Sequence, residues 1–164
     1  MASAGTAPAP INNSAANTAA NPGTSAVNAA RTAAAARVLM SARWFYWIAG
    51  LSLINSMVVI FGGTFHFVIG LGITSAVDEL AKQAGSAGVL LELLINGMVA
   101  GMFVLFGSFA GKRQKWAFFV GMGLYVLDGL LLLMAGDILS VAFHAYALFC
   151  IYRGLAVVDA AAQA

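Results

Sequence analysis

Four long hydrophobic runs dominate the chain after its first 43 residues. They cover about residues 44–61, 88–110, 116–135 and 138–158. An α-helix of that length, at about 1.5 Å per residue, crosses a hydrocarbon core about 30 Å thick. Backbone amides inside such a core need partners within their own segment, so helices are favoured over strands. The pattern predicts an all-α polytopic membrane protein with four transmembrane helices in an antiparallel bundle.

The segment between the first two runs follows a different pattern. Glycines at 62, 63, 70 and 72 interrupt its apolar residues. Farther along, Ser75 can cap a helix that has Asp78 in its first turn and apolar residues at helical spacing. We expect a short interfacial helix over about 74–84, lying on the bilayer surface. A re-entrant segment is the alternative.

The N-terminal part of the chain is made of small and polar residues. Residues 1–30 carry no charge, are rich in Ala, Asn, Ser and Thr, and contain all three prolines. Because few large apolar groups are available to offset the entropy of ordering, we expect residues 1–30 to form a disordered tail. From about Ser25 the alanines, with Arg31, Arg37 and Arg43, favour a helix that leads into the first span. Residues 31–164 then form the transmembrane domain.

Composition points to lipid as the solvent. Of the 164 residues, 62% are hydrophobic and 9% are charged, and the mean hydropathy is +0.91. An ordinary soluble domain has about 25% charged residues. The net charge is +2, and the basic residues form no cluster large enough to hold a phosphate backbone, so nucleic acid is not expected as a partner. The expected partners are the bilayer and another membrane protein or a second copy of the chain.

The distribution of positive charge predicts the orientation. Seven of the eight basic residues fall on one side of the predicted topology: Arg31, Arg37, Arg43, Lys112, Arg113, Lys115 and Arg153. Only Lys82 falls on the other side. Short cytoplasmic loops are enriched in Lys and Arg, so both termini are expected in the cytoplasm, with the protein in the cell inner (plasma) membrane.

A few polar residues lie inside the predicted spans and form a candidate site. They are Glu92 and Asn96 in the second span, Tyr125 and Asp128 in the third, and His144 in the fourth. Counted from the span ends, Glu92, Asp128 and His144 lie at similar depth. We expect Asp128 and His144 to pair across a turn made only of Gly136 and Asp137, with Glu92 nearby. Asp137 itself is expected to cap the fourth helix.

Two functions suit such a cluster. Interhelical hydrogen bonds can hold the helices together, which predicts a non-catalytic structural or interaction subunit of a larger assembly. Alternatively, titratable groups in contact can relay protons, which predicts a small transporter or proton-conducting protein. No cofactor is expected; haem or a divalent metal at His66 and His144 is the weaker possibility. Enzyme motifs are poor, so no catalytic activity is expected.

Small residues repeat at helical spacing in two spans. Gly97 and Gly101 in the second span, and Ala117 and Gly121 in the third, have the small-x-x-x-small pattern that lets helix backbones approach closely. They are expected to pack helices, within this chain or between copies.

The stretch KWAFFVGMGLYVLDGLLLLMAGDILSVAFHAYALFCIYRG, residues 115–154, resembles the C-terminal half of a family of small four-helix bacterial inner-membrane proteins. The resemblance covers roughly the last 70 residues and centres on Tyr125, Asp128, Asp137 and His144. It implies four spans and a bacterial origin, and carries no activity.

Overall fold

The computed structural model describes residues 22–60 and 86–163, and every long element in these ranges is a helix. The elements are α1 (Pro22–Ile60), α3 (Ser86–Gly111), α4 (Lys115–Met134), α5 (Ile138–Leu155) and α6 (Val158–Ala162). The all-α prediction is confirmed for these residues. The predicted interfacial helix over 74–84, together with His66 and Lys82, lies outside the described residues.

Helix α1 corrects the prediction of a tail that extends to residue 30. The helix begins at Pro22, so residues 22–30 are helical. Proline is well tolerated in a first helical turn, where its missing N–H has no intrahelical partner. The alanine-rich residues that follow have high helix propensity. Once the helix has nucleated, it can extend through them without burying a large apolar surface. The prediction considered only how little apolar surface this segment could bury, and it therefore missed the helix.

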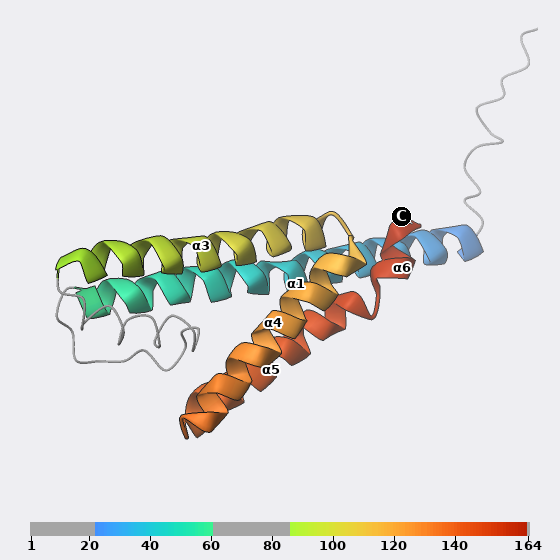
Figure 1. Cartoon of the computed structure of the whole chain (residues 1–164). Coiled ribbons are helices and arrows are strands. Elements are labelled where there is room, and N and C mark those ends of the chain that lie inside the picture. Colours follow the sequence, from blue (N-terminus) through green and yellow to red (C-terminus); the bar gives the residue numbers. More distant parts are fainter. Residues whose placement is uncertain (1–21, 61–85, 164) are drawn as a thin grey trace, which may run out of the picture.

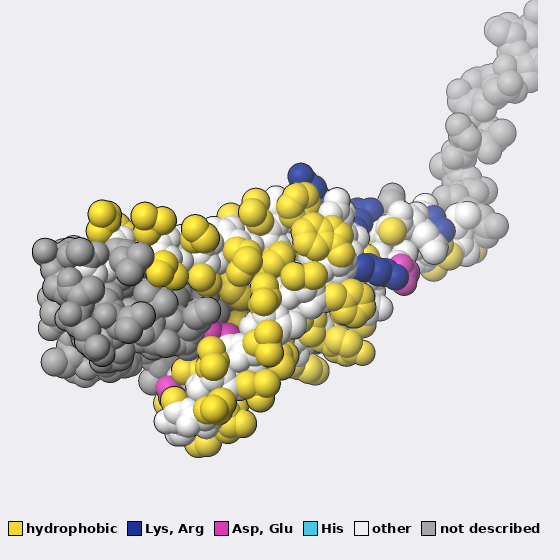
Figure 2. Space-filling model, viewed as in Figure 1, with side chains coloured by type: hydrophobic (Ala, Val, Ile, Leu, Met, Phe, Trp, Pro, Cys, Tyr) yellow, Lys and Arg dark blue, Asp and Glu magenta, His cyan; other side chains and the backbone are white. Residues whose placement is uncertain are grey.

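Three helices are long and apolar enough to cross a membrane. They are Leu93–Gly111 within α3, Lys115–Met134 and Ile138–Leu155. Their outward faces carry large apolar side chains such as Met98, Phe119 and Leu127. Hydrophobic side chains cover much of the visible surface (Figure 2). An exterior of this kind suits lipid, because water would leave a large contiguous apolar area solvated. Although α1 is longer than these three helices, no stretch of its described residues is apolar enough to be counted with them.

The helices form two antiparallel pairs, α1 with α3 and α4 with α5 (Figure 1). The pairs meet where α1 also touches α5 and α6, and where α3 touches α4. Away from this junction they diverge, so they do not run side by side over their full length as a regular bundle would (Figure 1). Close packing is concentrated at the junction, where Phe45 is fully buried among Phe103, Phe106 and Phe118.

Small residues in α4 allow the helices to approach closely at the junction, and the two predicted small residues in α3 lie outside it. Ala117 and Gly121 are buried in α4, and a Cβ placed on Gly121 would lie 2.6 Å from Phe45 Cε1. By contrast, Gly97 and Gly101 are exposed, and a Cβ on either would meet no atom of the described residues within 4 Å. The described helices therefore do not use this second pair for packing, and its use between copies stays a prediction. The bulky face of α3 turns inward instead, because its phenylalanines fill the space around Phe45.

Short turns set the register of the C-terminal pair. The turn between α4 and α5 contains Gly136 at φ +77°, a left-handed conformation that glycine adopts without steric cost. Asp137 then caps α5, as predicted, by accepting a hydrogen bond from the Ser140 backbone N–H at 3.1 Å. The predicted fourth span, 138–158, is shorter than expected: α5 ends at Leu155 and a separate helix, α6, follows and packs on α1.

Candidate functional site

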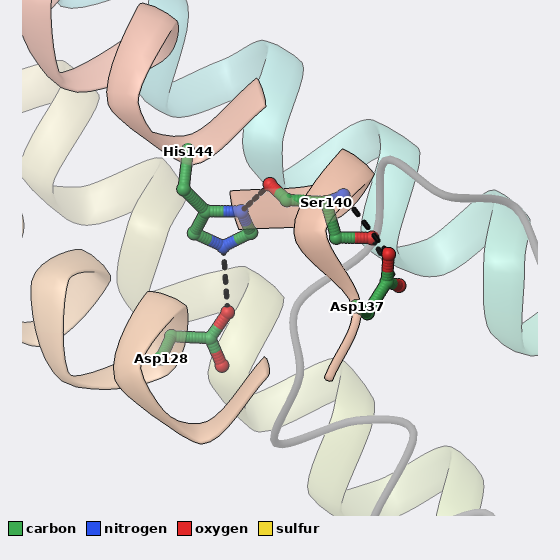
Figure 3. Close-up of polar contacts among 4 residues, drawn as sticks. All are labelled: Asp128, Asp137, Ser140 and His144. Carbon is green, nitrogen blue, oxygen red and sulfur yellow. Dashed lines mark hydrogen bonds and ion pairs between the residues drawn. The ribbon is translucent and has the colours of Figure 1, made fainter. Parts of the chain in front are cut away.

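The candidate site is a buried pair between α4 and α5. His144 Nε2 lies 2.9 Å from Asp128 Oδ2, and the two side chains are 2% and 5% exposed (Figure 3). The structure thus brings together the two residues whose pairing the sequence predicted. The tight turn after α4 makes this contact possible, because it returns α5 alongside the helix that carries Asp128.

The second ring nitrogen determines where the protons lie. His144 Nδ1 donates a hydrogen bond to the Ser140 carbonyl oxygen at 2.8 Å, since a carbonyl can only accept. Nε2 and the Asp128 oxygen also need a hydrogen between them, because two acceptors 2.9 Å apart would repel. Whether the carboxyl O–H or the imidazolium N–H donates, the pair has no net charge. A neutral pair is the form in which two ionisable groups are least costly to bury.

Two neighbours on α4 fix the orientation of the imidazole. Tyr125 stacks on it with ring centroids 4.1 Å apart and planes 16° apart. Gly129 faces the same ring, and a Cβ there would lie 3.4 Å from the His144 ring and Cβ atoms. Tyr125 was among the predicted site residues, whereas Gly129 was not. Together they let the imidazole lie flat against α4, and they cover one of its faces.

The hydrogen bonds continue from the pair toward the turn. Ser140 Oγ donates to Asp137 Oδ2 at 2.5 Å, and the Ser140 backbone N–H donates to Oδ1 (Figure 3). These two bonds, the side-chain one foremost, hold the pKa of the Asp137 carboxyl below its usual value. However, His144 contacts the carbonyl of Ser140 and not its hydroxyl. The contact between Ser140 and His144 therefore runs through the backbone of Ser140.

Asn96, another predicted site residue, does not join the pair. Asn96 lies in the other helix pair, where its Nδ2 donates to Ser56 Oγ at 2.7 Å. Glu92 belongs to α3, but its side chain lies outside the described part of the structure. Sequence reasoning missed Ser56 as the partner of Asn96. The signal was available, because Ser52, Asn55 and Ser56 place three polar groups on one face of α1 and all three are buried.

The surroundings of the pair are apolar. Asp128 is the one polar residue lining a hollow of about 180 Å³ between α3 and α4, whose other lining residues include Met102, Phe103 and Leu127. Within the described ranges, no group of three or more His, Cys, Asp or Glu side chains could hold a metal ion. The arrangement joins α4 to α5 through one buried polar contact.

Comparisons of the chain with protein-family models, with curated proteins and with solved structures found no match.

Proposed function

We propose that this chain is a non-catalytic integral membrane protein that serves as a structural or interaction subunit of a larger membrane assembly. The observation that carries the proposal is the use made of Asp128 and His144. Both nitrogens of the imidazole are engaged, one of its faces is covered by Tyr125, and the pair is almost completely buried. A general acid or base must reach a substrate, whereas an interhelical contact needs only its partner.

A fourth span formed by α1 is part of this proposal. The segment of α1 from Leu39 to Ser56 lies against the membrane-length part of α3, from Gly111 back to Asn96. Helices in contact at matching depth share the same solvent, so a bilayer that surrounds α3 also surrounds this half of α1. The whole helix is about 58 Å long at 1.5 Å per residue, and its N-terminal half extends beyond one face of the bilayer.

The distribution of charge supports a bacterial plasma membrane with both termini in the cytoplasm. Lys and Arg side chains gather at the end of the molecule that holds the turn between α3 and α4 and the C-terminus (Figure 2). The opposite end of the α4–α5 pair carries only Asp137 as a charged residue. Such an asymmetry is typical of the positive-inside rule.

Cysteine labelling in intact cells tests this orientation. Cys150 is first replaced by Ala, and single cysteines are introduced at Ala135, in the α4–α5 turn, and at Gln114, in the α3–α4 turn. We expect an impermeant maleimide to label Ala135→Cys from outside and Gln114→Cys only after permeabilisation. The reverse pattern would overturn the orientation, and labelling of both from outside would overturn the spans.

Reconstitution separates the subunit hypothesis from proton conduction. Purified protein in proteoliposomes is challenged with a pH gradient and a potassium–valinomycin potential. We expect proton flux equal to that of empty vesicles, and extraction in mild detergent to retain a second polypeptide at fixed stoichiometry. Flux that disappears in Asp128→Asn, with the variant still inserted and folded, would support conduction and overturn the subunit proposal.

A further inference from the structure

An open groove lies between α1 and α5 at the basic end of the molecule. Its volume is about 530 Å³, and its lining includes Arg37 and Ser41 from α1 and Cys150 and Arg153 from α5. Ser41 is buried and its Oγ donates to the Cys150 carbonyl oxygen at 2.8 Å. This hydrogen bond fixes the two helices at the base of the groove, so the shape of the groove is built into their contact.

Two arginines, Arg37 and Arg153, lie at one end of this groove. Within the described ranges neither Arg37 nor Arg153 forms an ion pair, and the guanidinium of Arg153 lies 5.9 Å from the ring centroid of Phe149. Asp159, an acid at the same end, is already paired with Lys115 at 2.6 Å. Guanidinium groups match phosphate geometry and can bind it in a bidentate manner. The polar end of the groove is thus complementary to a phosphate.

The groove continues into an apolar hollow along the same two helices. This second hollow, about 390 Å³, shares Met40 and Trp44 with the first and extends to Trp47, Leu51 and Phe143; Arg43 is its one charged lining residue. Trp44 packs edge-on against Tyr146, with ring centroids 5.5 Å apart. From Arg37 to Leu51 the path along α1 is about 21 Å, enough for a headgroup and much of one leaflet.

We propose that this groove binds one anionic phospholipid. Its phosphate lies between Arg37 and Arg153, its glycerol region lies beside Trp44 and Tyr146, and one acyl chain follows Trp47 and Leu51. The order of chemistry along the groove, from cationic through amphipathic aromatic to apolar, matches that of a lipid entering the bilayer. The proposal depends on the membrane insertion of α1 proposed above.

Native mass spectrometry of the full-length protein tests the charge preference. The protein in dodecylmaltoside is titrated with phosphatidylglycerol or phosphatidylcholine of identical acyl chains. We expect the first bound phosphatidylglycerol to be held about tenfold more tightly than phosphatidylcholine, since each basic residue near a headgroup adds severalfold to the affinity. Arg37→Gln/Arg153→Gln should abolish this preference. Lys112→Gln/Arg113→Gln, which removes the same charge from the same end but outside the groove, should keep it.

Tryptophan quenching tests the position of the acyl chain. In a Trp44→Phe/Trp116→Phe background, in which Trp47 is the remaining tryptophan, phosphatidylglycerol with brominated chains should quench the fluorescence at the concentrations that saturate binding. Absence of quenching there would overturn the proposed path.

Other outcomes of the titration are equally decisive. Equal loss of preference in both double variants would show a general charge effect and overturn the proposal. Competition by inorganic phosphate at concentrations comparable to the lipid would identify a free anion as the ligand, and a dimer that excludes lipid would identify a second copy. Release of the protein from membranes by alkaline carbonate would instead overturn the membrane insertion itself.

Discussion

The two helix pairs of this molecule are held together by different chemistry. Between α4 and α5 the central polar contact joins an ionisable pair, Asp128 and His144, whose neighbours Tyr125 and Gly129 fix the ring. Between α1 and α3 it joins an amide and a hydroxyl, Asn96 and Ser56. A charged group without its partner is far costlier in an apolar medium than a hydroxyl. The α4–α5 pair is therefore expected to depend more strongly on a single contact.

The largest expected effect comes from removing the acid of the buried pair. Asp128→Leu leaves His144 Nε2 facing an apolar side chain, and a buried polar group without a partner costs about 1 to 3 kcal/mol. We expect a loss near the upper end of that range, measured by thermal or denaturant unfolding in detergent.

The matched variants for this position are Asp128→Asn and Leu127→Ala. The amide of Asn can donate to Nε2, so Asp128→Asn should recover most of the stability. Leu127 is exposed at the preceding position of the same helix, and Leu127→Ala should change little. If Asp128→Leu were as stable as the wild type, Asp128 and His144 would not be the contact that holds α4 to α5.

The junction between the pairs should be the next most sensitive place. A Cβ on Gly121 would lie 2.6 and 2.8 Å from two ring atoms of Phe45, which is fully buried and has little room to move. Gly121→Ala is therefore expected to cost about 1 to 3 kcal/mol through overpacking. Gly123→Ala is the control, because it meets no atom within 4 Å and should gain up to about 1 kcal/mol of helix propensity. Equal unfolding temperatures for the two variants would contradict the close approach at the junction.

The helix cap at Asp137 predicts a pH dependence confined to the α4–α5 pair. Asp137→Ala should cost about 1 kcal/mol, the usual value of an N-cap. Since hydrogen bonds from Ser140 lower the pKa of the folded carboxyl, its contribution is complete above the unfolded pKa of about 3.9 and is lost as the pH falls through the folded value.

The difference in unfolding temperature between wild type and Asp137→Ala, measured at pH 7 and then at progressively lower pH, should shrink below about pH 4. A difference that stays constant across this range would mean that the charge of Asp137 does not stabilise α5.

Sequence reasoning succeeded where one short-range rule governs the outcome. The α4–α5 turn is only three residues long, from Ala135 to Asp137, so it forces the two helices together and makes the Asp128–His144 pair predictable from spacing. Which face of a helix turns inward could not be predicted in this way. The small residues of α3 and α4 have the same spacing, but the phenylalanines around Phe45 decide which face turns inward, and this depends on residues far apart in the chain.

The same limit explains Asn96. Its depth in α3 suggested the cluster around Asp128, whereas its actual partner, Ser56, lies on a helix forty residues earlier. The depth of a residue within a helix can be counted along the sequence. Which neighbouring helix its polar side chain meets depends on how the helix pairs assemble.

The smallest expected effect tests the neutral contact of the α1–α3 pair. Ser56→Ala removes the hydroxyl that accepts from Asn96, and such a bond between membrane helices contributes about 0.6 kcal/mol. Ser52 is the matched control, one turn earlier on the same helix: its Oγ is buried and has no hydrogen-bond partner among the described residues, so Ser52→Ala should be neutral or slightly stabilising. Unfolding of both variants in the same detergent gives the difference directly. If the two serines cost the same, packing rather than the Asn96 bond joins α1 to α3, and the contrast between the pairs is larger still.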